Sequence, residues 1–284
     1  GRELDIGALY ITDDGKTRLY VDVDTETWDD FVLNYWQSHH NATTVDWGDG
    51  TTPETKYDYS WVEHRHVYAA SGSYVITMSV KEGTTMELGN GSNSRRLIAN
   101  DGTDSGRCAM LRRVEVGARA TTITDQTFQS CSRLESIAIP QDVEVKGYLT
   151  FNQATQLRVI VIQSITNVFR SFYNCTNLRA IAGPGTMDYT DEYTLANTAL
   201  RQLNAAVTTA YATYALERVH IKAVNGRVGD FSGAFSLLEA TIPADATTFV
   251  AAAFQGDYAL RKVTCLGNIA SIPAQVFQRC YPLR

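Results

Sequence analysis

Apolar residues recur at regular intervals through the C-terminal two thirds of the chain. A leucine stands at nine positions, and we call these the anchors: Leu111, Leu134, Leu157, Leu178, Leu200, Leu216, Leu237, Leu260 and Leu283. The intervals between them are 23, 23, 21, 22, 16, 21, 23 and 23 residues. Six residues before most anchors stands a phenylalanine: Phe128, Phe151, Phe172, Phe231, Phe254 and Phe277. Such a period predicts an array of stacked structural units.

Each unit reads as one coil. The Leu-x-x-Ile-x-Ile segment predicts a short strand, and the Phe-x-x-Cys segment before it predicts a turn or a helical piece on the opposite side. Neither segment can bury its apolar face alone, so the coils must stack and share one core. We therefore expect nine coils, with rings such as Phe128 and Phe254 buried inside them.

The repeated segment is clearest in CSRLESIAIP (131–140), CTNLRAI (175–181) and AFSLLEATIP (234–243). It resembles the BspA-like class of leucine-rich repeat, which occurs in surface antigens of gut and oral bacteria. The resemblance covers residues 105–284 and implies a surface protein that binds other molecules. Thr194 and Ala210 replace the phenylalanine in the middle units, where we expect an irregular region.

The N-terminal part has a different pattern. Alternation of apolar and polar residues over 19–23 and 74–80 predicts strands, and the segment WGDGT (47–51) predicts a tight turn whose glycines adopt positive φ. Together with HVY (66–68) and GSYVI (72–76), these motifs resemble the polycystic-kidney-disease (PKD) type of immunoglobulin-like sandwich. That resemblance implies an extracellular spacer or adhesion module.

The chain is therefore predicted to be mainly β, in three parts. Residues 1–83 form a PKD-like β-sandwich, 84–104 a junction or cap, and 105–284 the leucine-rich-repeat solenoid with short strands and turn or helical pieces. Within the junction, Arg96-Leu97-Ile98 is expected to form a strand that caps the first coil.

Charge and motifs exclude several functions. A net charge of −6 argues against nucleic acid as a partner, and no apolar run approaches the roughly 18 residues of a membrane span. No Gly-x-Ser-x-Gly, His-Glu-x-x-His or phosphate-binding loop is present, and the carboxylates of Asp188, Asp191 and Glu192 fit a solvated loop better than a glycosidase pair.

We expect a non-enzymatic protein without a cofactor, secreted or held at the bacterial surface, where a lipid anchor is one means of attachment. Its partner would be a surface macromolecule of the host or of a bacterium, either a protein or a glycan.

Four of the five cysteines occupy one repeat position, three residues before an anchor: Cys108, Cys131, Cys175 and Cys280. Other units place Ala154 or Ala234 there, so the position favours a small buried residue and free thiols. Cys265 stands on a predicted strand and is also expected in the core.

Two other groups could in principle bind a metal ion. His64 and His66 share one face of a predicted strand, and Asp22, Asp46 and Asp49 could supply oxygen ligands for calcium. Packing of the imidazoles and capping of turns by the aspartates account for both groups without a metal, so no metal site is predicted.

The residue after each anchor forms a mostly basic row: Arg112, Glu135, Arg158, Arg179, Arg201, Glu217, Leu238 and Arg261. This row is either a solvated ladder that keeps the sheet soluble or a face for an acidic partner, and Arg158, Arg179 and Arg201 are the candidate binding residues. The alternative function is a carbohydrate-associated accessory protein, in which Tyr57, Tyr59 and Trp61 stack on sugar rings.

Overall fold

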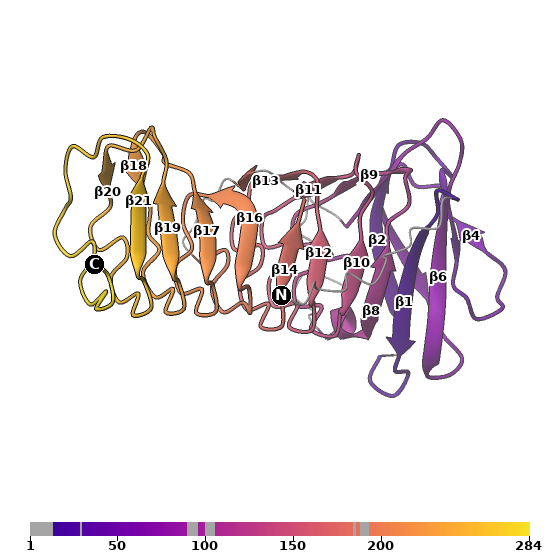
Figure 1. Ribbon diagram of the computed structural model, residues 1–284. Coiled ribbons are helices and arrows are strands. Elements are labelled where there is room, and N and C mark those ends of the chain that lie inside the picture. The colour runs from indigo at the N-terminus through magenta and orange to yellow at the C-terminus, as the bar shows by residue number, and fades with distance from the viewer. Residues whose placement is uncertain (1–13, 29, 90–95, 100–105, 184–185, 188–192) are drawn as a thin grey trace.

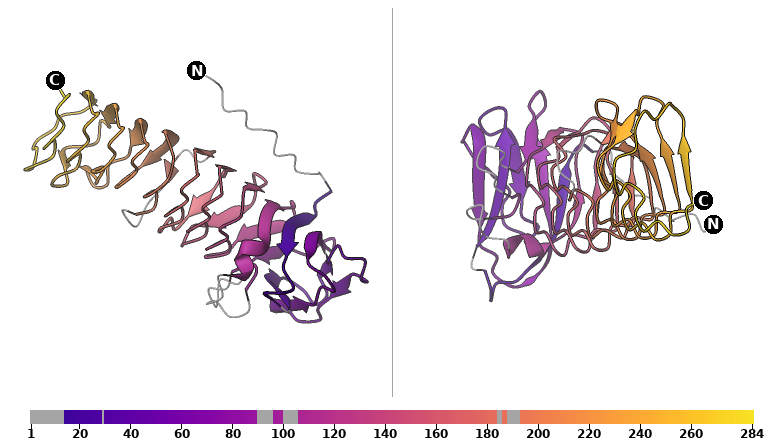
Figure 2. Two further views of the ribbon diagram at one scale, coloured as in Figure 1. Left: turned by 90° about the horizontal axis from the view of Figure 1, so that it is seen from below. Right: turned by 90° about the vertical axis from the view of Figure 1, so that its left-hand side faces the viewer.

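The computed structural model describes residues 14–28, 30–89, 96–99, 106–183, 186–187 and 193–284. These residues form an elongated stack of β-coils with a two-layered β structure at the N-terminal end (Figures 1 and 2). Figure 2 shows the molecule along its length and from one end of the stack.

Two antiparallel sheets make up the N-terminal end. The first contains β4 (Glu54–Thr55), β3 (Thr43–Asp46), β6 (Gly72–Val80) and β1 (Thr17–Val23), in that order. The second contains β5 (Ser60–His66), β2 (Phe31–Gln37) and β7 (Met86–Leu88). The strands predicted for 19–23 and 74–80 are confirmed as parts of β1 and β6, and burial alternates along β1 as the sequence does.

The turn after β3 depends on Gly48. Its φ is +77°, and a Cβ built on it would lie 2.4 Å from the carbonyl oxygen of Val75. Gly50 also has a positive φ, +87°, so the predicted turn is confirmed. The turn lets Trp47 enter the core, where it is fully buried against the edge of Phe31.

The solenoid has two faces built from strands and a third built from turns. In the first half, β8 (Leu111–Glu115), β10 (Ser136–Ala138), β12 (Val159–Val161) and β14 (Ala180–Ala182) form one parallel face. The second face contains β9 (Ala120–Ile123), β11 (Glu144–Lys146) and β13 (Ile165–Thr166). In the second half, a five-stranded sheet contains β15 (Thr186–Met187), β16 (Gln202–Val207), β17 (Arg218–Ile221), β19 (Glu239–Ile242) and β21 (Lys262–Cys265), and it provides the first face from β16 onward. β15 pairs with the end of β16, and β18 (Arg227–Val228) and β20 (Thr248–Phe249) form the second face.

The third face consists of turns, so of the two alternatives predicted for the Phe-x-x-Cys segment the turn is confirmed and the helical piece is not. Its backbone bonds run between coils: Phe128 N–H donates to Thr150 O at 2.9 Å, and Phe151 N–H donates to Ser171 O at 3.0 Å. Positive φ values at residues such as Ser130 interrupt any helical run. Among the described residues the one helix is the 3₁₀ turn η1 (Arg107–Met110).

Buried rings join the coils, as the sequence predicts. Phe128, Phe151 and Phe172 form one stack with centroids 5.6 and 5.5 Å apart. Phe231, Phe254 and Phe277 form a second stack with spacings of 5.5 and 5.6 Å. The buried Thr194 and Ala210 lie at this position in the units between the two stacks.

The solenoid makes about seven turns rather than the nine that the anchors suggest. Nine anchors delimit only eight intervals, and the 16-residue interval from Leu200 to Leu216 carries no strand on the second face. The irregular middle region is confirmed: the first-face sheet is interrupted between β14 and β16, and the pairing of β16 with β17 shifts between Leu203 and Ala206.

Both sheets run without a break from the N-terminal end into the solenoid. β1 pairs with β8, so that Leu19 lies opposite Val114, and β7 pairs with β9, so that Leu88 lies opposite Ile123. One cluster of buried apolar residues spans both parts. The separate immunoglobulin-like sandwich that the PKD-type resemblance implies is therefore not confirmed, and the limits 1–83, 84–104 and 105–284 remain predictions.

The segment Arg96–Ala99 contacts both parts of this core. Leu97 accepts a bond from Asn34 N–H and donates its own N–H to Thr127 O, both at 2.8 Å. Ile98 makes an isolated bridge to Leu33 instead of belonging to the strand expected for Arg96-Leu97-Ile98. The backbone of this segment pairs with the edge of β2, and the buried Asn34 side chain donates to the carbonyl oxygens of Arg96 and Ala99 at 3.1 and 2.8 Å.

Candidate functional site

The residues that follow the anchors form a continuous row on the outer surface of the first half of the solenoid. Backbone bonds join them coil to coil: Glu135 N–H donates to Arg112 O, and Arg179 N–H donates to Arg158 O, both at 2.8 Å. Between these pairs, Arg158 N–H reaches Glu135 O at 3.4 Å. The side chains of Arg158 and Arg179 are exposed and lie one coil apart.

Acidic side chains compensate some of these arginines and leave others unpaired. Arg112 pairs with Asp22 at 3.0 Å and also with Glu135. Arg201 pairs with Glu217, to which its Nε donates at 2.8 Å. Within the described part of the chain, Arg158 and Arg179 have no ion pair, and segments 154–163 and 174–183 contain no acidic residue.

The predicted arginine trio is thus divided. Arg158 and Arg179 follow the anchors of β12 and β14 and lie together, whereas Arg201 lies beyond the interruption of the sheet and is neutralised by Glu217. Sequence spacing alone cannot show this, because Arg201 has the same place in its unit as the other two.

The second predicted group lies at the N-terminal end. Tyr57 and Tyr59 are 70% and 60% exposed, in the loop that precedes β5. The His40 ring stacks on the Tyr57 ring, with centroids 4.2 Å apart and planes 9° apart. The centroids of the His40 and Tyr59 rings are 5.5 Å apart. Trp61 is half-buried on β5 opposite Trp36 of β2, so it is not part of this cluster.

The four cysteines of the column are confirmed as core residues, whereas the fifth cysteine, Cys265, is not. Cys108, Cys131, Cys175 and Cys280 are buried, and the thiols of Cys175 and Cys280 donate at 3.0 Å to the carbonyl oxygens of Phe151 and Phe254. Burial raises the pKa of Cys175 to about 12, so this thiol is inert at neutral pH. Cys265, expected in the core, is exposed, because β21 is the last strand of its sheet and no later coil covers it.

The histidines and aspartates singled out in the sequence act in packing and in turns. His66 stacks on Trp47 at 4.7 Å and bonds Asp49 at 2.8 Å, whereas the buried His64 bonds Glu54 at 3.1 Å. Burial lowers the pKa of His64, so it is neutral at pH 7. In the described ranges, no three His, Cys, Asp or Glu side chains are arranged to hold a metal ion.

The aspartates that could have formed a calcium cage do not meet. Burial alone would raise the pKa of Asp49, but hydrogen bonds from Thr51 and His66 prevail and lower it to about 2. Asp46 accepts a bond from Gly48 N–H at 2.9 Å, which caps the turn. Asp22 lies apart from both and pairs with Arg112 and Arg133. The predicted turn-capping role is confirmed for Asp46 and Asp49.

Asp257 is an unusual residue that the sequence reading passed over. It stands at the cysteine position of its unit, is fully buried, and accepts a bond from Ala234 N–H at 3.1 Å through Oδ1. Burial raises its pKa to about 9, so the carboxyl group is protonated at neutral pH. An acidic residue at a position that other units fill with cysteine, alanine, asparagine or threonine was the signal that could have identified it.

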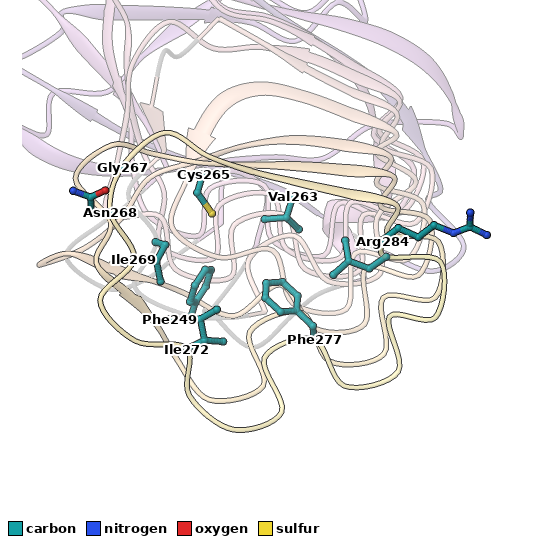
Figure 3. A pocket seen from close by; sticks show the side chains of 10 residues that line it. Phe249, Val263, Cys265, Gly267, Asn268, Ile269, Ile272, Phe277 and Arg284 are labelled. Atoms are coloured by element: carbon teal, nitrogen blue, oxygen red, sulfur yellow. The ribbon is translucent and has the colours of Figure 1, made fainter.

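A shallow hollow lies at the C-terminal end of the stack (Figure 3). Its lining is mostly apolar and includes Phe249, Val263, Ile269 and Phe277. These side chains belong to the layer of the shared core at the C-terminal end of the described stack. Asp188, Asp191 and Glu192, the candidate carboxylates, lie outside the described residues.

Comparisons with known proteins agree with the repeat pattern. The family model described as the BspA-type leucine-rich-repeat region matches residues 106–222 and 210–284, in six copies. Among solved structures, a leucine-rich cell surface protein from Faecalibacterium prausnitzii A2-165 is similar, with 17% identity, a TM-score of 0.35, and coverage of 62% of this chain and 73% of that one. No curated protein matches the chain.

The family match starts at residue 106, so the PKD-type resemblance of residues 15–82 remains a prediction. No helix in the described ranges is long and apolar enough to span a membrane. The matched residues cover more than half of the chain and include every anchor. The chain therefore belongs to the family of BspA-type leucine-rich-repeat proteins.

Proposed function

We propose that this protein is a non-enzymatic, ligand-binding protein of the bacterial surface that binds an acidic macromolecule through Arg158 and Arg179. One observation carries the proposal: two exposed, adjacent guanidinium groups lack acidic partners in the described structure. Membership of the BspA-type family supports the surface location.

The two arginines are not explained by the needs of the fold. Like charges on neighbouring coils repel each other, and in the same row Arg112 and Arg201 are compensated by glutamates. An acidic protein already has the net charge that solubility requires. An uncompensated pair therefore favours contact with a negatively charged partner.

The surroundings of the pair suit a large partner. Val159, Val161 and Ala180 are half-buried side chains on the same strands, so the face is shallow and without bulky neighbours. Arginine binds carboxylate, sulfate or phosphate groups with two parallel hydrogen bonds, and neighbouring coils can hold successive groups of a polymer. Acidic glycans and acidic protein segments share this chemistry.

The test is binding to immobilised heparin and polyglutamate, with dextran as the neutral reference. We expect the wild-type protein to bind at least one polyanion and Arg158→Glu/Arg179→Glu to bind it about tenfold more weakly or worse. The matched control is Arg261→Glu/Lys262→Glu, the same charge change on a later coil, where Arg261 also follows an anchor. Equal binding by the wild type and the first variant would refute the proposal.

A second candidate function has its own observation. The exposed Tyr57 and Tyr59 gather around His40, which favours stacking against sugar rings in the carbohydrate-associated alternative. One face of Tyr57 is already covered by His40, so only its other face is open. A glycan array that compares the wild type with Tyr57→Ala/Tyr59→Ala tests this function separately, and the same array with Trp61→Ala tests the third residue.

A further inference from the structure

Four exposed aromatic side chains form a row along the second half of the solenoid. Tyr214, Phe235, Tyr258 and Tyr281 each stand two residues before an anchor and are 47%, 44%, 45% and 77% exposed. Their ring centroids are 5.3, 5.4 and 6.2 Å apart in order, so each ring contacts the next. We call this row the aromatic ladder. It lies in the other half of the solenoid from Arg158 and Arg179 and goes beyond the function proposed for them.

The fold does not require aromatic residues at this position. The four preceding units place small hydroxyl residues there: Ser132, Thr155, Thr176 and Thr198. Thr155 uses its hydroxyl to bond Ser132 O on the neighbouring coil at 3.0 Å, which shows that a short polar side chain satisfies the turn. Contiguous exposed apolar surface of this kind marks an interaction site.

The four rings lie nearly parallel, with planes 24°, 31° and 13° apart. Their centroid spacing is close to the 5.5–5.6 Å of the buried phenylalanine stacks, so it follows from the distance between coils. Each ring is at least 44% exposed, so every one of these coils presents part of an aromatic side chain to solvent.

The ladder is electrically neutral along most of its length. The chain neighbours of Tyr214 and Phe235 are uncharged: Thr213, Ala215, Ala234 and Ser236. Beside Tyr258 stand Ala259 and Asp257, whose buried carboxyl group has a pKa of about 9 and so carries no charge at pH 7. The residues next to these rings in the sequence therefore carry no charge that would select a charged partner, and the nearest charged residues of the same units, Glu217 and Arg261, stand three positions after the rings.

The size and chemistry of the ladder favour a narrow polymer. A side chain of this size offers about 150–250 Å², so four rings at these exposures supply roughly 400 Å², about half of what one partner buries in a stable protein interface. Three of the four carry a phenolic hydroxyl, which adds hydrogen bonds to an otherwise apolar line. Sugar rings have the same combination of an apolar face and a hydroxyl rim, whereas acyl chains have no hydrogen-bonding groups.

We propose that the aromatic ladder binds a neutral, linear polysaccharide that runs along the solenoid axis, with sugar rings stacked on the aromatic rings of successive coils. The test is affinity electrophoresis in native gels that contain hydroxyethylcellulose, glucomannan, laminarin or dextran. The variant is Phe235→Thr/Tyr258→Thr, which installs the residue that three earlier coils have at this position. A competing variant, Tyr57→Thr/Tyr59→Thr, removes the exposed tyrosines of the N-terminal cluster, and the matched control is Tyr148→Thr, an exposed aromatic residue outside both clusters.

We expect at least one of these glycans to retard the wild type and the control, and to bind the ladder variant about tenfold more weakly or worse. Absence of retardation in all four gels, or equal retardation of the ladder variant, overturns the proposal. Loss of retardation in the Tyr57→Thr/Tyr59→Thr variant, with the ladder variant retarded like the wild type, assigns sugar binding to the N-terminal cluster and also overturns it. If light scattering shows that the wild type is a dimer and the ladder variant is a monomer, the ladder binds a second copy of this chain. That result would also overturn the proposal.

A measurement on the unaltered protein keeps the test independent of whether the variant folds. Tetranitromethane nitrates exposed tyrosines, and the modified peptides are identified by mass spectrometry. The retarding glycan should protect Tyr214, Tyr258 and Tyr281 and leave Tyr57 and Tyr59 as reactive as before. Unchanged nitration of the ladder at saturating glycan contradicts the proposal.

Discussion

Removal of the Phe254 ring tests whether the stacked phenylalanines hold the coils together. Phe254 is fully buried, lies between Phe231 and Phe277, and meets Phe249 edge-on at a centroid distance of 6.3 Å. Loss of such a ring costs the transfer free energy of its apolar surface and leaves a cavity, so Phe254→Ala should lower the free energy of unfolding by about 3–5 kcal/mol.

The chain offers a matched control in Phe277→Ala. Phe277 has the same place in the last unit, but it is only partly buried and stacks on one side alone. Its loss should cost about half as much, since roughly half as much surface returns to water. Urea unfolding followed by far-UV circular dichroism gives both values, and hydrogen exchange locates the weakened coils. A cost below about 1 kcal/mol for Phe254→Ala, or one no larger than that of the control, would show that the stack does not carry this stability.

Two further predictions concern the cysteine column. All five cysteines should titrate as free thiols in denaturant, because four are buried in the column without a disulfide and Cys265 stands apart from them on β21; a count of three or fewer would show that disulfides form. The raised pKa of Asp257 means that the folded state keeps a proton that the unfolded state releases, so stability should fall as pH rises from about 4 to 9. Asp257→Ala, which installs the residue of Ala154 and Ala234, should flatten this dependence; parallel urea midpoints of the two proteins at pH 5 and pH 8 would contradict the assignment.

Local periodicity was sufficient to predict the solenoid. The anchors, the rings and the cysteine column each follow from one residue type that recurs at one coil length. These leucines, phenylalanines and cysteines are buried as expected, except Phe277 and Leu283 of the last unit, which are partly buried. The departures at Thr194 and Ala210 likewise marked where the first-face sheet is interrupted. Repetition makes such inferences robust because each unit meets the same environment as the next.

The features that were missed depend on contacts between distant segments. The pairing of β1 with β8 joins residues about 95 positions apart, and no local pattern encodes it. The same contact places Asp22 beside Arg112. This ion pair is one reason why Arg112 is compensated, whereas Arg158 and Arg179 in the same row are not. Cys265 is exposed because β21 is the terminal strand of its sheet in the described structure. The place of a residue within its own unit does not show whether another strand packs beside it.

The most direct test of the proposed binding face is arginine labelling with phenylglyoxal, with and without saturating heparin, read out by peptide mass spectrometry. Arg158 and Arg179 are exposed and unpaired in the described structure, so both should react readily in the free protein. We expect heparin to protect these two residues strongly while Arg261, in the same row four units beyond Arg179, stays reactive. Equal labelling of Arg158 and Arg179 in the presence and absence of bound heparin would contradict the proposed site.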